Sequence, residues 1–166
     1  MKLRLGSLFQ NHLVLQRDRP VPVWGWCGPG ARVEVEVGPV RGAGKAGDDG
    51  RWRVLLPPQP AAGPLTLVVK SGRDERRIED VWVGEVWLAS GQSNMEMKVE
   101  ACRDADREMA AADIPGIRVW TTLRTPALTP RDEAEGNWQV CSPATVAGFS
   151  AAGYFLTELV DSMRIL

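Results

Sequence analysis

Hydrophobic and polar residues alternate along several short runs in the first half of the chain. Residues 32–37 alternate strictly between valine and charged residues, which is the pattern of a strand with one buried face. Residues 52–56 and 65–69 are further strand candidates, and residues 47–50 have the Asp and Gly composition of a tight turn. Because prolines and glycines separate these short runs, residues 1–80 predict an all-β sandwich of the jelly-roll type.

The pattern changes near residue 80. Residues 81–89 form a nearly continuous apolar run, as expected of a strand buried on both faces of a parallel sheet. Residues 98–113 lack Gly and Pro and favour a helix, and residues 117–121 predict a second strand. Residues 125–142 have a loop composition, whereas residues 144–163 carry apolar side chains at the three- and four-residue spacing of an amphipathic helix.

Residues 81–166 therefore predict the opening of an α/β domain with a parallel sheet. Two strands are too few to cover two amphipathic helices, since sheets average about five strands. The sequence also stops on the apolar residues Ile165 and Leu166. We therefore expect this domain to be truncated.

Composition and charge exclude several classes of function. The chain has 20 Lys and Arg against 21 Asp and Glu, a net charge of -1, which gives no electrostatic basis for binding nucleic acid or an anionic membrane. No run approaches the roughly 20 apolar residues of a membrane-spanning helix. The first residues turn polar too early for a signal peptide, so the sequence as written predicts a cytoplasmic protein. The odd, scattered set Cys27, Cys102 and Cys141 predicts three reduced thiols, with neither a disulfide framework nor a zinc site.

Candidate chemistry lies where the apolar run ends, in residues 90–93 (Ser-Gly-Gln-Ser). A serine at the end of a buried strand is presented to solvent, Gly91 leaves room for an acyl group, and the N–H groups of a following helix could bind an oxyanion. These features together suit acyl transfer. The alternative is a serine that only caps a helix. The segment is also not a Gly-x-Ser-x-Gly elbow, because Met95 stands at the last position.

Residues 84–96 (GEVWLASGQSNME) resemble the nucleophile block of the sialate O-acetylesterases, a branch of the SGNH hydrolases. Four other blocks follow the same order: residues 8–18 and 20–26 resemble the start of the family's N-terminal β-domain, residues 49–52 resemble its Asp-Gly-x-Trp turn, and residues 142–155 resemble the helix after the second strand of the hydrolase domain. The resemblance covers essentially the whole chain.

This resemblance implies a serine esterase that removes O-acetyl groups from sugars, with an O-acetylated sugar as its substrate. Ser93 would be the nucleophile and its N–H one oxyanion donor. Gly91, Gln92 and Asn94 would shape the active-site loop without transferring protons. No metal and no organic cofactor is implied. Relatives of this kind commonly act on exported glycans, which leaves the compartment open.

The chain departs from the family after Ser93. These hydrolases add a glycine and an asparagine as oxyanion donors, and then an Asp-x-x-His pair that activates the serine. None of these follows in recognisable form, and the single histidine is His12, in a polar turn where we expect a structural role. A serine without a base is a poor nucleophile, so we expect the isolated chain to be nearly inactive.

Three readings of function remain open at this point. The first is an esterase fragment, with residues 1–80 as a β-sandwich accessory domain and residues 81–166 as the front of an SGNH domain. The second is a module whose β-domain binds carbohydrate or a partner, with a vestigial hydrolase segment. The third is a split enzyme, in which another polypeptide supplies the remaining half of the hydrolase domain.

Overall fold

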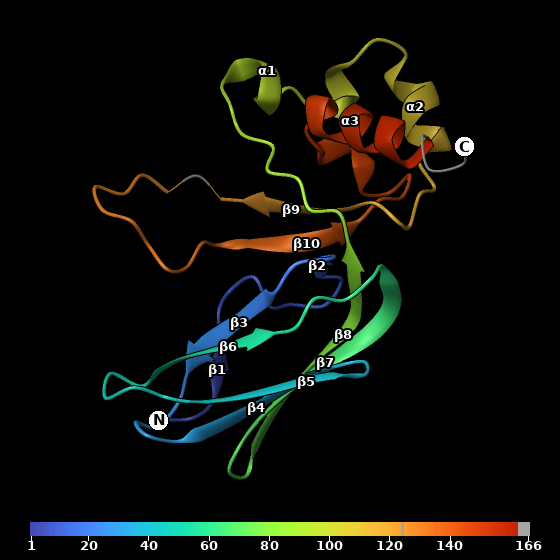
Figure 1. Ribbon diagram of the computed structural model, residues 1–166. Coiled ribbons are helices and arrows are strands. Elements are labelled where there is room, and N and C mark those ends of the chain that lie inside the picture. The colour runs from blue at the N-terminus through green and yellow to red at the C-terminus, as the bar shows by residue number, and fades with distance from the viewer. Residues whose placement is uncertain (124, 163–166) are drawn as a thin grey trace. The chain divides into compact units, whose positions relative to one another are not determined.

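The computed structural model describes residues 1–123 and 125–162 and has a mostly β fold with few helices (Figure 1). The chain divides into two compact units. Met1–Val86 and Thr122–Asn137 form the first, here called the β unit. Trp87–Thr121 and the described part of the stretch from Trp138 onward form the second, here called the helical unit.

Two sheets make up the β unit, in the strand orders β1-β3-β6 and β2-β8-β7-β4-β5. The strands are β1 (Arg4–Leu5), β2 (Val14–Gln16), β3 (Val21–Trp26), β4 (Arg32–Val37), β5 (Val40–Lys45), β6 (Arg51–Leu56), β7 (Ala62–Ser71) and β8 (Asp74–Gly84). The predicted alternation of residues 32–37 is confirmed, because Val33, Val35 and Val37 of β4 are all buried. A Cβ atom added to Gly42 of β5 would lie 2.7 Å from Val54 of β6, so the two sheets pack closely around this core.

The predicted strand over residues 81–89 is wrong in its extent and its setting. Its first residues belong to β8, where Val81 and Val83 are buried, and β8 pairs antiparallel with β7 and parallel with β2. The later residues leave the sheet, and Leu88 is 93% exposed. The apolar run therefore divides at Gly84, because residues beyond it have no neighbouring strand within the described part of the chain.

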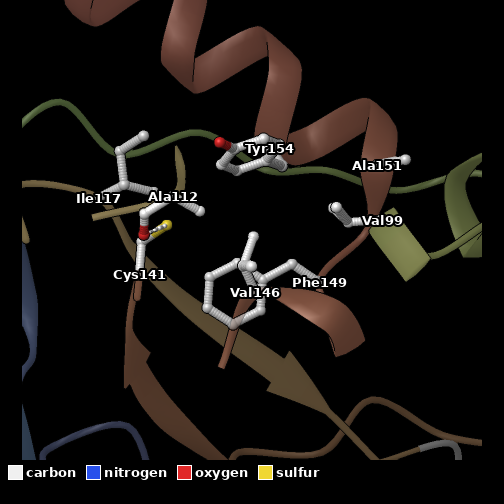
Figure 2. Close-up of a cluster of buried hydrophobic side chains, with 8 residues drawn as sticks. All are labelled: Val99, Ala112, Ile117, Cys141, Val146, Phe149, Ala151 and Tyr154. Atoms are coloured by element: carbon white, nitrogen blue, oxygen red, sulfur yellow. Dashed lines mark hydrogen bonds between the residues drawn. The ribbon is translucent and has the colours of Figure 1, made fainter. Parts of the chain in front are cut away.

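The helical unit is built from short helices. They are α1 (Ser93–Glu96), the 3-10 turn η1 (Val99–Ala101), α2 (Ala105–Ala111), the 3-10 turn η2 (Val146–Gly148) and α3 (Ala151–Ser162). Their shared core consists of eight buried side chains, shown in Figure 2: Val99, Ala112, Ile117, Cys141, Val146, Phe149, Ala151 and Tyr154. Because Val99 and Phe149 both lie in this core, the segment that follows α1 packs against the segment that precedes α3.

The strands β9 (Arg118–Thr122) and β10 (Gly136–Val140) form a separate two-stranded sheet. Leu123 N–H donates to Glu135 C=O near one end of the pair and Cys141 N–H donates to Ile117 C=O near the other, so the strands run antiparallel. Within the described residues β9 pairs with β10 alone, so the predicted parallel sheet of residues 81–89 and 117–121 is not formed there.

Three further predictions in this region need correction. The helix expected over residues 98–113 is interrupted between η1 and α2, where Asp104 adopts a left-handed φ of 58° that a helix cannot contain. The loop expected over residues 125–142 contains β10. The helix expected over residues 144–163 is divided into η2 and α3, because Phe149 has an extended backbone (φ −71°, ψ 150°) and Ser150 forms a β-bridge with Lys98. Met163 lies outside the described residues.

Assignment of residues 1–80 to an accessory β-sandwich, and of residues 81–166 to the opening of an SGNH-type domain, stays a prediction. None of the helices described here combines the length and the apolar character needed to cross a membrane.

Candidate active-site turn

Ser93 is the first residue of α1, which is a single turn that follows an irregular segment (Figure 1). Gln92 takes the N-cap position with φ −112° and ψ −142°, and no side chain caps the helix. Capping therefore does not account for Ser93. The side chains of Gln92, Ser93 and Asn94 are exposed, and within the described residues of the helical unit the hydroxyl and N–H of Ser93 have no hydrogen-bond partner.

Gly91 lies in close packing with Met95, and its backbone angles do not call for glycine. Its φ does not lie in the left-handed region, but a Cβ atom at this position would lie 3.3 Å from the Cβ atom of Met95. The turn is closed by two hydrogen bonds to the Gln92 carbonyl, from the N–H groups of Met95 (3.0 Å) and Glu96 (3.1 Å). The backbone of Gly91 and Gln92 thus shapes the loop that presents Ser93.

The segment after Ser93 is fastened to the beginning of α3. Lys98 and Ser150 form an isolated antiparallel bridge. Three hydrogen bonds surround it: Val99 N–H to Phe149 C=O at 3.1 Å, Ala151 N–H to Met97 C=O at 2.8 Å, and Ser150 Oγ to Met95 C=O at 2.6 Å. The sequence blocks 84–96 and 142–155, which are far apart along the chain, therefore meet at this point.

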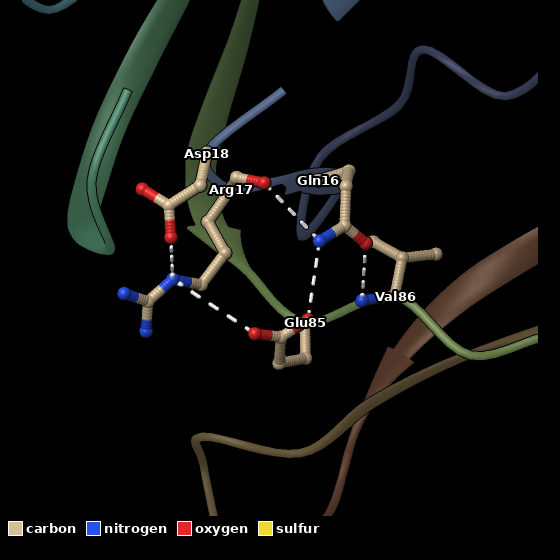
Figure 3. A network of polar contacts seen from close by, with 5 residues as sticks. All are labelled: Gln16, Arg17, Asp18, Glu85 and Val86. Carbon is tan, nitrogen blue, oxygen red and sulfur yellow. Dashed lines mark hydrogen bonds and ion pairs between the residues drawn. The ribbon is translucent and has the colours of Figure 1, made fainter. Parts of the chain in front are cut away.

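The first residues of block 84–96 are held within the β unit, through the network in Figure 3. Gln16 of β2 donates from Nε2 to Glu85 Oε2 at 3.1 Å and accepts from the Val86 N–H at 3.0 Å. Arg17 Nε lies 2.6 Å from Asp18 Oδ2 and 3.8 Å from Glu85 Oε1. Asp18 and Glu85 raise the pKa of Arg17, Asp18 by its hydrogen bond and its charge. This network fixes the chain just before it leaves the β unit.

His12 belongs to the β unit and has a structural partner there. It adopts a left-handed φ of 71°, and its Nδ1 lies 2.7 Å from Asp80 Oδ2. The other oxygen of Asp80 accepts from Trp82 Nε1 at 2.8 Å. These contacts agree with the structural role that we expected for His12, and the chain has no other histidine.

Thiols and metal ligands are the other groups that could carry chemistry in this chain. All three cysteines are free, as predicted. Cys141 is buried in the core of the helical unit, and this burial raises the pKa of its thiol, which disfavours the nucleophilic thiolate. Within residues 1–123 and 125–162, no group of His, Cys, Asp or Glu side chains is arranged to hold a metal ion.

Comparison with known proteins gives the chain its relatives. It is 33% identical over 137 residues to the sialate O-acetylesterase of Pongo abelii, covering 75% of this chain and 26% of that protein. It is 34% identical over 119 residues to the sialate O-acetylesterase of Homo sapiens, covering 64% of this chain and 23% of that protein. The crystal structure of a carbohydrate acetylesterase from Xanthomonas citri superposes with a TM-score of 0.94 and 36% identity, over 97% of this chain and 38% of that one.

The chain belongs to the sialate O-acetylesterase family. It spans about a quarter of the length of the curated relatives that it matches. No family model matches it.

Three structural features of this member of the sialate O-acetylesterase family could not be predicted from its sequence. The contact between Ser150 and Met95 joins residues too distant for any local motif, and so does the contact between Gln16 and Glu85. The third feature is the segment 132–136, which packs within the β unit against the sheet β1-β3-β6. It is held there by four contacts: Arg4 with Glu133 at 2.6 Å, Arg51 with Asp132 at 2.8 Å, Ala134 N–H with Ser7 Oγ at 3.2 Å, and Gln10 Nε2 with Gly136 C=O at 3.2 Å.

Segment 132–136 lies at the edge of a cavity of about 930 Å³ in the β unit. Trp26 lines this cavity, and the guanidinium of Arg4 lies 3.9 Å from the centre of the Trp26 ring. Trp26 also lines a neighbouring cavity of about 320 Å³. Neither cavity includes a residue of the Ser93 turn.

Proposed function

We propose that this chain carries the nucleophile of a carbohydrate O-acetylesterase, with Ser93 attacking the acetyl ester of an O-acetylated sugar. The observation that supports this most strongly is the placement of Ser93. It lies exposed at the start of α1, its hydroxyl has no hydrogen-bond partner among the described residues of the helical unit, and a Cβ atom at position 91 would lie only 3.3 Å from the Met95 Cβ atom. The acetyl ester and the sugar in this proposal are taken from the relatives, which are named as a sialate O-acetylesterase and a carbohydrate acetylesterase.

In the proposed reaction, Ser93 Oγ loses its proton to a base and forms a bond to the acetyl carbonyl carbon. The resulting oxyanion accepts a hydrogen bond from the Ser93 N–H, which has no partner among the described residues of the helical unit. Collapse of the tetrahedral species breaks the bond to the sugar oxygen, which leaves as a protonated hydroxyl. Water then hydrolyses the acetyl-serine to acetate and restores Ser93.

Gly91, Gln92 and Asn94 act by shape in this proposal. Gly91 allows the turn to close on Met95, and the Gln92 carbonyl accepts the two N–H groups that complete it. Asn94 is exposed beside the nucleophile and has no part in proton transfer.

We propose that the base comes from outside this chain. Its single histidine is engaged by Asp80 in the β unit, and loss of the histidine or the serine from a triad typically lowers kcat by about 10⁶-fold. We therefore propose that the isolated chain is nearly inactive, and that a segment with an Asp and a His completes the site, as in the SGNH hydrolases that it resembles.

The test is a chimera in which this chain replaces the matched segment of the Xanthomonas citri acetylesterase. Acetate release from an O-acetylated sugar is compared for the chimera and for its Ser93→Ala and Ser90→Ala variants. Ser93→Ala should abolish release, whereas Ser90→Ala should retain most of it, because Ser90 lies in the same exposed loop but outside the turn. Equal loss in both variants, or release that survives Ser93→Ala, contradicts the proposal.

A second candidate function rests on the cavity of about 930 Å³ in the β unit. An aromatic ring with polar side chains around it is suited to binding a sugar, and here Trp26 lies beside Arg4 and Gln10. Titration of the whole chain with a sugar, followed by the amide signals of residues 4–10, tests this candidate. Trp26→Ala should remove the response and Trp87→Ala, at an exposed tryptophan of the helical unit, should not.

A further inference from the structure

Ser150 makes two kinds of contact from one hydroxyl group. Its Oγ donates to the Met95 carbonyl at 2.6 Å, with the Met95 Sδ at 3.3 Å, and accepts from the Gly153 N–H at 3.3 Å. We propose that Ser150 is a positioning residue for Ser93, an inference that rests on the proposed function of the Ser93 turn. It acts through the Met95 carbonyl and touches neither the substrate nor the reacting atoms.

The helix α1, which carries Ser93, is too short to be stable without contacts to other parts of the helical unit. It has four residues, and isolated helices much shorter than about 12 residues are marginal in water. No side chain caps its N-terminus, and its C-terminal end is closed by one backbone hydrogen bond, from the Met97 N–H to the Ser93 carbonyl. The orientation of Ser93 must therefore come from contacts made by the rest of the turn.

The Met95 carbonyl is the point where such a contact is made. Met95 lies on the same turn as Ser93, and the Ser93 carbonyl accepts the Met97 N–H at 3.0 Å. Met97 follows α1 directly, and its carbonyl accepts the Ala151 N–H at 2.8 Å. Ser150 and Ala151 therefore donate to the carbonyls of Met95, within α1, and of Met97, just after it, and only the Ser150 contact uses a side chain.

The hydroxyl of Ser150 also has a simpler role, which a test must separate from positioning. Its contact with the Gly153 N–H is the bond of a serine that caps α3, where Tyr154 N–H donates to the Ser150 carbonyl at 2.8 Å. A substitution to Ala removes both roles. Ser150→Asp keeps a cap acceptor but has no hydroxyl proton for Met95, and Ser150→Thr keeps both.

The first readout is hydrogen exchange in the isolated chain, which needs no catalysis. In Ser150→Ala and Ser150→Asp, we expect the Met97 amide, which closes the α1 turn, to exchange about 10-fold faster than in the wild type. Ser150→Thr should restore protection. Thr157→Val deletes another hydroxyl that donates to carbonyls within α3, to Gly153 at 3.1 Å and Tyr154 at 2.8 Å, and should leave Met97 unchanged. Unchanged Met97 exchange in Ser150→Asp, or equal acceleration throughout the helical unit, overturns the inference.

The second readout is kinetic and uses the chimera. A nucleophile displaced by about 1 Å can lose up to about 100-fold in rate, so Ser150→Asp should lower kcat at least 10-fold with little change in KM. The pH profile should keep its shape, because no proton-transfer group is altered, and Ser150→Thr should restore kcat. If Ser93→Ala abolishes acetate release but Ser150→Asp retains full kcat, the inference fails and the proposed function stands. If Ser93→Ala has no effect, the proposed function fails, while the exchange experiment still decides whether Ser150 orders the turn.

Discussion

The hydroxyl of Ser150 donates a 2.6 Å hydrogen bond to the carbonyl of Met95, although the two residues are 55 positions apart in the sequence. This bond joins the single-turn helix that carries Ser93 to the first residues of a longer helix, α3. The longer helix is itself anchored, since Phe149, Ala151 and Tyr154 lie in the core of the helical unit (Figure 2). The exposed turn thus takes its position from a buried core.

Gly91→Ala should disturb the Ser93 turn, because the new methyl group would meet the Met95 Cβ at 3.3 Å and push the two segments apart. In the chimera, kcat for acetate release should fall by about 10-fold or more. Gly116→Ala is the matched control in the same unit, since no described atom would lie within 4 Å of a Cβ atom there. This control should leave kcat unchanged. Equal loss of activity in both variants would contradict this account of Gly91.

Tyr154 should titrate at unusually high pH. Burial is the main cause that raises its pKa to about 12. Because the chain has one tyrosine, tyrosinate absorbance follows this group alone. We expect a midpoint near pH 12 in the folded chain, against about 10 in denaturant. A midpoint near 10 in the folded chain would show that the Tyr154 hydroxyl is open to solvent.

The same shift predicts how the stability of the helical unit depends on pH. The folded pKa lies above the unfolded one, so the stabilisation is fully present below about pH 10 and is lost as the pH rises from about 10 to about 12. The loss should be about 1.4 kcal/mol per pH unit, and the raised pKa of Cys141 acts in the same direction. Urea unfolding at several alkaline pH values measures the slope, and Tyr154→Phe should make it shallower.

Segment 132–136 should detach from the β unit when its ion pairs are removed. Arg4 and Arg51 hold Glu133 and Asp132, and all four side chains are substantially exposed, so each pair contributes about 0.2–1 kcal/mol. Replacing Glu133 by Gln and Asp132 by Asn should raise the rate of trypsin cleavage after Arg131 by about 2- to 10-fold. High salt should raise the wild-type rate similarly, because exposed ion pairs are screened. Glu34→Gln, which removes another exposed ion pair (with Arg32) in the same unit, should leave the rate unchanged.

The three thiols should report separately on the two units. Cys102 is partly exposed and should react with a thiol reagent in the folded chain. Cys27, in the β unit, is 2% exposed and Cys141, in the helical unit, is 1% exposed, so each should react only when its own unit opens. Mass spectrometry of the labelled peptides against urea concentration gives one opening curve for each. Fast labelling of Cys141 in the native chain would contradict its place in the core.

The local sequence pattern predicted some strands correctly and misplaced others. The alternation of residues 32–37 gave β4 with its buried face, because a strand with one solvated face must alternate. The apolar run 81–89 predicted a strand that is too long, because hydrophobicity does not mark where a strand leaves its sheet. Here the strand β8 ends at Gly84. The helix break at Asp104 was not predicted, because no Gly or Pro lies there. The strand β10 was not predicted either, because its residues lie in a stretch with loop composition.

The candidate site was predictable only in part. The turn around Ser93 was found from its position after an apolar run and from its resemblance to one family. Its supports were not, because Ser150 and Gln16 act through contacts with residues that are distant along the chain. The sequence predicted that Gly91 leaves room for an acyl group, and the structure adds the close approach of Met95 to this position.

The central claim is that Ser93 becomes acetylated during turnover. The most direct measurement is to quench the chimera with acid while it hydrolyses an O-acetylated sugar, and to map acetyl groups by peptide mass spectrometry. We expect one acetyl group on Ser93, none on Ser90, and none anywhere in the Ser93→Ala variant. Acetate release with an unmodified Ser93, or with the acetyl group on another residue, would contradict the account.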